Sequence, residues 1–301
     1  MHFRPKQVTR RGAALFALMS VVWGIPYLLI KIAVRDLSPP LVVEARTAIG
    51  ALVLLPLAAR QGQLGPLMRV WKPFLVYTVA ELAIPWLLLS DAERRLPSSL
   101  SGLLVATVPL FGVLLGIATR HRDRLGARGI AGLLIGLAGV AVLLGLDVHG
   151  DTGSVVEVIL VAIGYAIGPH LAARYFRDLS SLALAAVSLA LVALGYLPVA
   201  VWLHPERVPS GGAVASVVVL GLVCTALAFV AFFELIKEIG STRATVITYL
   251  NPAVAVLLGV AALGEPFSAA TAIGFALILA GSWFSTMSGS SLQPQRRWRS
   301  P

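Results

Sequence analysis

Glu81 is the residue most suited to chemistry in this sequence, because it interrupts the long apolar run that spans residues 73–91. An ionisable group at membrane depth is costly and marks a candidate functional residue. Loss of water penalises the charged form, so this carboxyl group can exchange protons near neutral pH. We expect Glu81 to bind a coupling proton or to balance a cationic solute. The alternative is a neutral glutamic acid that is hydrogen-bonded between helices.

Two of the apolar runs, 12–34 and 73–91, contain aromatic residues that are candidates for a solute site. Trp23, Tyr27 and Trp86 could line a cavity, and such rings suit flat or cationic solutes. Ordinary packing or anchoring at the membrane interface is the alternative. Pro26 and Pro85 lie beside them, and proline leaves a helical carbonyl without its usual donor.

Three polar residues of the second half are further candidates for binding a solute or coupling its transport. Asn251 can donate and accept hydrogen bonds, and Tyr249 lies two residues before it. His170 could change charge near physiological pH, although a lone histidine is more often simply hydrogen-bonded. Glu265, before Pro266, is expected to cap the helix that follows it.

Charged residues near the chain's expected outer loops receive structural interpretations. Lys31 is expected to pair with Glu44 or to extend its ammonium group to the interface. Arg46 is expected to be structural. Asp91, Glu93, Arg94 and Arg95 are expected to balance one another at a solvated loop edge.

No motif of a known catalytic or nucleotide-binding site is present. The only cysteine, Cys224, lies in an apolar run, which excludes an internal disulfide and a cysteine-based metal site. We therefore expect no catalytic residue, no metal and no cofactor.

The composition of this chain indicates a membrane protein. Of 301 residues, 58% are hydrophobic and 13% are charged, and the mean hydropathy is +0.88. Soluble domains carry roughly 25% charged residues. Helix-length apolar runs predict an all-α membrane protein with ten transmembrane helices. The runs are 12–34, 40–59, 73–91, 97–118, 129–146, 154–174, 180–203, 212–236, 242–262 and 268–287.

Basic residues alternate between the gaps that separate these runs. If the N-terminus is cytoplasmic, most of the 24 Lys and Arg residues fall on the cytoplasmic side. This bias follows the positive-inside rule, so we expect both termini in the cytoplasm. The terminal tails, residues 1–11 and 288–301, are expected there. The net charge of +10 is explained by this distribution, and we expect no nucleic-acid partner.

The two halves of the chain resemble each other. The segment that ends at Pro109 matches the segment that ends at Pro252, and the glycine-rich run from Gly132 matches the one from Gly274. The fourth and fifth helices thus correspond to the ninth and tenth. Five helices per repeat is an odd number, so the repeats, 12–146 and 154–287, must cross the membrane in opposite directions. Inverted repeats are typical of transporters.

These features resemble the EamA group of the drug/metabolite transporter superfamily. The resemblance rests on Trp23-Gly24, Lys31, Arg46, the two proline segments, and the run from Leu250-Asn251-Pro252 to Gly264-Glu265-Pro266 that is followed by Gly274 and Gly281. The first half departs from this pattern, with His121-Arg122-Asp123 where the second half has Gly264-Glu265.

The resemblance implies a secondary transporter in the cell (inner) membrane, often an exporter of amino acids, metabolites or toxic compounds. The expected partners are a small-molecule substrate, the lipid bilayer and coupling protons, and the protein is expected to act as a monomer or homodimer. An integral-membrane enzyme and an accessory membrane subunit are the alternatives, but the loops lack the polar clusters that an enzyme needs.

Overall fold

The computed structural model describes residues 9–119, 126–147, 151–205, 207–240, 244 and 246–287. Within these ranges the chain is helical and has no strand. The predicted tails lie almost entirely outside the described residues, as do His121, Arg122 and Asp123. The all-α prediction is confirmed. The physical reason is that a helix satisfies its backbone hydrogen bonds internally, as the hydrocarbon layer of a membrane demands.

The helices follow the predicted apolar runs. Those of the first half are α1 (Arg10–Val22), α2 (Pro26–Ala33), α3 (Pro39–Arg60), η1 (Gly65–Val70), α4 (Trp71–Thr78), η2 (Val79–Ala83), α5 (Ile84–Ala92), α6 (Ser98–Val105), α7 (Val108–Ala118) and α8 (Ala127–Asp147). Those of the second half are α9 (Thr152–Tyr175), α10 (Ser181–Trp202), α11 (Gly211–Gly221), η3 (Leu222–Leu227), α12 (Ala228–Ile239), α14 (Ile247–Leu263) and α15 (Ala269–Met287).

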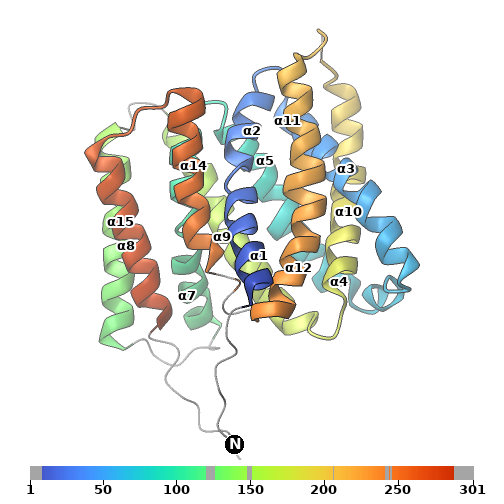
Figure 1. The fold of residues 1–301 in the computed structure, drawn as a ribbon, viewed down its shortest axis with the longest axis horizontal. Coiled ribbons are helices and arrows are strands. Elements are labelled where there is room, and N and C mark those ends of the chain that lie inside the picture. Colours follow the sequence, from blue (N-terminus) through green and yellow to red (C-terminus); the bar gives the residue numbers. More distant parts are fainter. Residues whose placement is uncertain are drawn as a thin grey trace, which may run out of the picture.

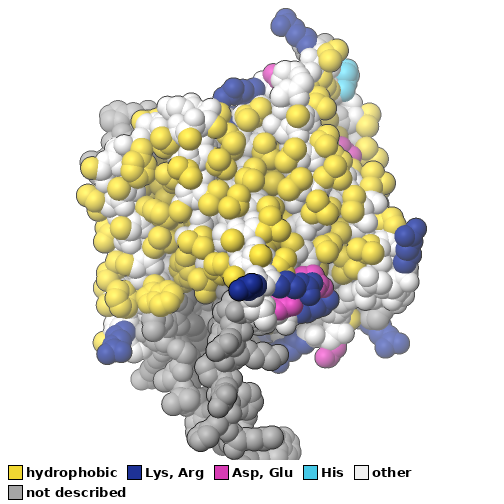
Figure 2. Space-filling view, in the orientation of Figure 1, with side chains coloured by type: hydrophobic (Ala, Val, Ile, Leu, Met, Phe, Trp, Pro, Cys, Tyr) yellow, Lys and Arg dark blue, Asp and Glu magenta, His cyan; other side chains and the backbone are white. Residues whose placement is uncertain are grey.

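Seven helical segments in the described ranges are long and apolar enough to cross a membrane, and three shorter apolar helices occupy the other predicted runs. The total of ten spans stays a prediction. Hydrophobic side chains cover the middle of the molecule, and Lys and Arg side chains gather toward its two ends (Figure 2). This distribution matches a hydrocarbon layer between two aqueous faces.

The two halves interlock through helices that correspond to each other in the repeat. The most extensive helix contacts join α8 to α15 and α3 to α10. These pairs lie at opposite edges of the bundle (Figure 1). We call the end of the bundle where α1 begins the α1 end, and the end where α2 finishes the α2 end. Arg95, which follows α5, reaches Ser154 in the first turn of α9 at the α2 end, so α1 and α9 start at opposite ends.

Glycines permit the contact between α8 and α15. A Cβ atom on Gly132 would lie 2.4 Å from the Ser285 nitrogen, and one on Gly274 would lie 2.6 Å from Leu143 Cγ. In lipid the hydrophobic effect does not drive helices together, so their association depends on the van der Waals contacts that such close backbone approach permits. The matching glycines of the two repeats therefore meet at one interface.

Prolines interrupt several helices where the sequence places them. Pro26 starts α2 after a break at residues 23–25, and Pro109 follows the break between α6 and α7. Pro252 instead lies inside the continuous helix α14. At the first break, Gly24 lets α14 approach, since a Cβ atom there would lie 2.5 Å from Val254 Cβ.

Two π-helical segments, η2 and η3, widen the third and eighth spans. They contain Glu81 and Cys224, which are separated along the chain by the same distance as Pro109 and Pro252. The π-helical geometry is thus repeated in both halves. Single-turn π-segments occur frequently at functional sites because they free backbone groups and redirect side chains.

Candidate functional site

Glu81 points from η2 into the seam between η2 and α9. A Cβ atom on Gly168 would lie 1.8 Å from Glu81 Oε2, so only glycine leaves room for this carboxyl group. Gly164, one turn earlier, lies against the Ala80 carbonyl in the same way. Oε2 of Glu81 is buried and has no hydrogen-bond partner among the described residues. A buried polar atom left without a partner costs about 1–3 kcal/mol, so this site favours a proton or a ligand.

Arg46 lies in the interior beside this seam. Its side chain is carried by α3 and is buried, with 7% of the residue exposed. Its Nε donates to Thr225 Oγ1 of η3 at 2.9 Å, and its guanidinium carbon lies 3.7 Å from the centre of the Trp86 ring. The Thr225 hydroxyl in turn donates to the Leu220 carbonyl of α11 at 2.8 Å. Arg46 therefore joins the two repeats at the level of both π-segments.

Tyr165 of α9 lies close enough to both Arg46 and Glu81 to interact with them electrostatically. Tyr27 of α2 and Cys224 of η3 also lie within electrostatic reach of Arg46. We call Tyr27, Arg46, Glu81, Trp86, Tyr165 and Thr225 the central cluster. Its members come from helices of both repeats, which is the position expected for a site between two inverted halves.

The structure brings three of the predicted site residues, Glu81, Tyr27 and Trp86, into this cluster. Trp23 lies nearby and packs on Phe232 and Phe229 of α12, with ring centroids 4.6 and 6.3 Å away. Pro85 is buried next to Trp86 at the start of α5.

The other predicted site residues lie apart from the cluster. With its amide oriented to satisfy both atoms, Asn251 donates to the carbonyls of Ile247 and Ser20, which ties α14 to α1. Tyr249 packs edge-on against Trp283 of α15. His170 lies half-buried in α9, after the glycines that contact η2.

Glu93 is fully buried at the α2 end, and the expected solvated loop edge was wrong for this residue. Neither of its carboxyl oxygens has a hydrogen-bond partner within the described ranges. Burial raises the pKa of the Glu93 carboxyl well above its usual range, and the nearby Lys31 opposes this rise. Arg94 and Arg95 do pair with Asp91, at 3.4 and 2.6 Å.

Lys31 does not pair with Glu44. Its ammonium group instead donates to the backbone carbonyls of Glu93 and Leu96, at 2.7 and 2.8 Å. Both residues follow α5, which ends at Ala92, so their carbonyls accept no hydrogen bond within that helix. Lys31 thereby fastens α2 to the end of the third span.

Glu265 caps a different helix from the one expected. Its carboxylate accepts hydrogen bonds from the backbone nitrogens of Ser98 and Ser99, at 2.6 and 2.9 Å, and so caps α6 of the first half rather than α15. Burial acts to raise the pKa of Glu265, but the hydrogen bonds from Ser99 and Ser98 outweigh it and hold the pKa below its usual value. Gly259 makes room for the carboxylate, since a Cβ atom there would lie 2.4 Å from Oε2.

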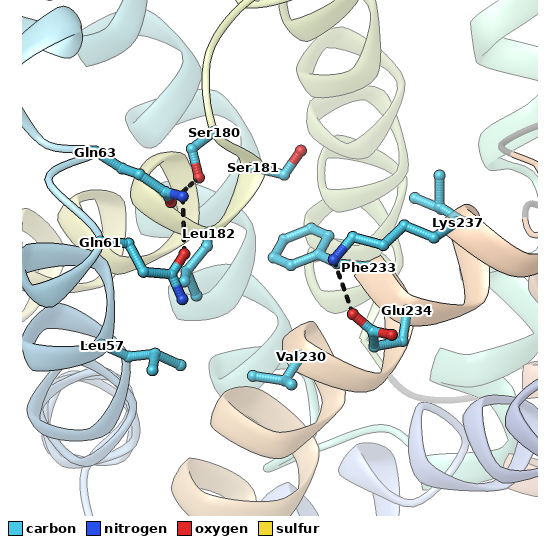
Figure 3. Close-up of a pocket in the computed structure, with 11 residues that line it drawn as sticks. Leu57, Gln61, Gln63, Ser180, Ser181, Leu182, Val230, Phe233, Glu234 and Lys237 are labelled. Carbon is cyan, nitrogen blue, oxygen red and sulfur yellow. Dashed lines mark hydrogen bonds and ion pairs between the residues drawn. The ribbon is translucent and has the colours of Figure 1, made fainter.

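The α1 end carries a cavity of about 430 Å³ between α3, α10 and α12 (Figure 3). We call this cavity the vestibule. Its lining residues are Leu57, Gln61, Gln63, Ser180, Ser181, Leu182, Val230, Phe233, Glu234, Ile236 and Lys237. Ion pairs from Arg11 to Glu234 and Glu238, at 2.9 and 3.2 Å, join α1 to α12 beside it.

The vestibule does not reach the central cluster. Phe233 lines it and stacks on Phe229, with ring centroids 6.0 Å apart, and Phe229 contacts Trp23. Phe229 follows Thr225 by four residues and precedes Phe233 by four, so it lies along the eighth span between the partner of Arg46 and the lining of the vestibule. None of the residues that line the vestibule belongs to the central cluster.

Several residues of the site were missed in the sequence. The Gly-x-x-x-Gly spacing of Gly164 and Gly168 was readable as a helix-packing motif, and Tyr165 lies within it. Thr225 and the burial of Glu93 had no such signal, because both depend on which helices meet. In the described ranges, no group of three or more His, Cys, Asp or Glu side chains is placed to hold a metal ion.

Comparisons with known proteins agree with this architecture. The model of the EamA-like transporter family matches residues 10–145 and 153–287. YedA, an uncharacterized inner membrane transporter of Escherichia coli (strain K12), is 32% identical over 278 residues, which cover 89% of this chain and 87% of the relative. A probable terminal-alkyne amino-acid exporter of Streptantibioticus cattleyicolor is 26% identical over 270 residues, with 88% and 89% covered. One solved crystal structure has the same fold, with a TM-score of 0.66, 24% identity, and 92% and 97% coverage.

Proposed function

Because the chain belongs to the EamA-like transporter family, we propose that it exports a small metabolite, amino acid or drug-like solute by alternating access. The membrane is the cytoplasmic (inner) membrane, with both termini in the cytoplasm. The repeats 12–146 and 154–287 act as the two moving halves, and one chain encloses its own pathway.

The observation that carries this proposal is the central cluster. It is built from both halves, and it lies where η2 and η3 interrupt regular helical hydrogen bonding. Relative movement of the halves must change the distance between Arg46 of α3 and Thr225 of η3. A solute bound there can therefore be exposed to one side and then to the other.

The described conformation supports a route that starts at the α1 end. The vestibule lies there, and Phe233 in its lining stacks on Phe229. At the α2 end, Glu265 and Lys31 instead make hydrogen bonds that join helices to one another. The positive-inside bias assigns the α1 end to the cytoplasm, so this conformation receives solute from the cell interior.

Glu81 is the proposed coupling residue. Its carboxyl group lies against Gly168 with one buried oxygen unpartnered, and Tyr165 connects it electrostatically to Arg46. Protonation of Glu81 removes a charge from the seam between η2 and α9. Proton binding at this seam can thus favour one arrangement of the two halves over the other.

Excretion profiling combined with vesicle transport tests the proposal. Cells that overproduce the protein should release one or a few metabolites faster than cells without it, and deletion should lower that release. The released solutes should then move through purified protein in proteoliposomes, faster when a proton gradient is imposed. Unchanged excretion profiles together with no transport of metabolite mixtures would contradict the proposal.

A further inference from the structure

Arg46 is a buried cation without a carboxylate partner. In the part of the chain that the structure describes, no Asp or Glu lies within ion-pair distance of its guanidinium group. The bond from Nε to Thr225 uses one of its five N–H donors, and Trp86 covers one face of the plane. Among the described residues, the bond from Nε to Thr225 is the one hydrogen bond of this guanidinium group. Removing a charge from water is costly unless it is paired, so the site favours an anion.

The geometry suits a carboxylate in particular. The planar guanidinium fork matches the two oxygens of a carboxylate, and Trp86 and Thr225 hold the plane in place from opposite repeats. The hydroxyl groups of Tyr27 and Tyr165 lie within electrostatic reach of the same group and can add hydrogen bonds. A carboxylate bound to Arg46 would lie near these hydroxyl groups and near the Trp86 ring.

The charge balance selects a single carboxylate over a phosphate. Arg46 is the one Lys or Arg of the central cluster, so one negative charge neutralises it. A phosphate would carry up to two charges and would leave one unpaired in a buried site. Glu81 lies within electrostatic reach of Tyr165, and when ionised it would repel a second negative group.

We propose that Arg46 binds the carboxylate of the transported solute, which makes carboxylate-bearing metabolites the substrate class. The proposal rests on the transport function proposed above. In this arrangement the carboxylate of the solute forms an ion pair with the Arg46 guanidinium group. Its carboxylate contacts a residue held by both halves, so binding is sensitive to their relative position.

The first test needs no variant. Purified protein in detergent is titrated with L-phenylalanine and L-leucine, and with the amide of each, and binding is followed by thermal stabilisation. Each amide keeps the shape of its acid but lacks the negative charge. We expect the acids to bind roughly ten- to hundredfold more tightly than the amides, because hydrogen bonds between charged groups are lost. Equal binding of acid and amide, or no binding of either acid, would overturn the proposal.

The second test assigns the interaction to Arg46. Arg46→Gln should reduce binding of the acid to the level of the amide, and Arg46→Lys should give an intermediate loss because a lysine keeps charge without the planar fork. Arg60→Gln, at the exposed end of the same helix, is the matched control and should bind like the wild type. Acid binding retained by Arg46→Gln would overturn the assignment.

Excretion profiling separates this inference from the transport function itself. If the protein exports solutes that lack a carboxylate, the function stands and the inference is wrong. If no solute moves in cells or in proteoliposomes, the proposed function is wrong and the inference falls with it. Exported solutes that all carry a carboxylate, and that are lost with Arg46→Gln, would support both.

Discussion

Removing the Glu265 carboxylate should loosen the first turn of α6 at the α2 end. The backbone nitrogens of Ser98 and Ser99 donate to this carboxylate at 2.6 and 2.9 Å, and the first amides of a helix have no acceptor within it. In Glu265→Ala both bonds are lost. In Glu265→Gln one neutral oxygen remains, so that variant should lie between the alanine variant and the wild type.

The magnitude follows from these two bonds. Each hydrogen bond to a charged acceptor contributes about 1.5–3 kcal/mol. Glu265 is partly exposed, and solvent screening lowers the total for the pair to about 2–3 kcal/mol. We therefore expect the amides of Ser98 and Ser99 to exchange with deuterium roughly 30- to 150-fold faster in Glu265→Ala.

Hydrogen–deuterium exchange of peptides that cover residues 97–105 measures this effect. Asp36→Asn is the matched control, because Asp36 accepts an exposed hydrogen bond from the Ser210 nitrogen at 2.9 Å at the same end. It should change exchange near Ser210 and leave 97–105 unaltered. Exchange in Glu265→Ala within about twofold of the wild type would show that the carboxylate does not hold α6 in the way described here.

The pKa of Glu265 adds a pH signature to the same contact. Its hydrogen bonds hold the pKa below the usual value, so their contribution is fully present above the pKa of an unfolded glutamate, about 4.3. The contribution is lost as the pH falls through the lower pKa of the folded state. The first amides of α6 should therefore exchange more slowly in the wild type than in Glu265→Gln at neutral pH, and this difference should disappear in acid.

Four further predictions concern other parts of the chain. Glu81→Gln should transport at a rate that no longer varies with pH, and retained pH dependence in proteoliposomes would exclude Glu81 as the coupling residue. Gly168→Ala should lower the thermal stability of the purified protein by about 1–3 kcal/mol, because its Cβ atom would lie 1.8 Å from Glu81 Oε2; Gly112→Ala, with nothing within 4 Å, is the control and should not destabilise it. Burial raises the pKa of Glu93, so its contribution to stability is greatest at low pH and is lost as the pH rises through the folded-state value; melting temperatures of Glu93→Gln should lack this decline. Cys224, 1% exposed, should react with N-ethylmaleimide far more slowly in the folded protein than after denaturation, and equal rates by mass spectrometry would contradict its burial.

The helices of this protein were predictable because membrane insertion imposes a local rule. Each span needs a helix-length apolar run, and glycines mark where such helices can touch. The close approach of α8 and α15 through Gly132 and Gly274 agrees with their repeated glycines. Proline by itself does not decide a break, because the helix breaks before Pro26 and Pro109 but continues through Pro252. Glu81 was recognisable for the same reason, since a carboxyl group in an apolar run is exceptional at any depth.

Side-chain partners were a different matter, because they depend on residues far apart in the chain. Glu265 was expected to cap the helix after it, yet folding brings it to the first turn of α6. Glu93 was expected among solvated charges, yet it is fully buried. Local charge patterns carry no information about which turn of another helix will lie opposite.

The amino-acid sequence alone determined that this chain is a helical membrane protein with two related halves, because hydropathy, charge bias and repeated prolines are properties of continuous segments. Only the tertiary structure decided that Arg46 faces Thr225 and Trp86 and that Glu81 rests on Gly168. The contacts of Arg46 with Thr225 and of Glu81 with Gly168 arise where helices of opposite repeats meet, and the register of such a contact is set by the packing of the whole bundle.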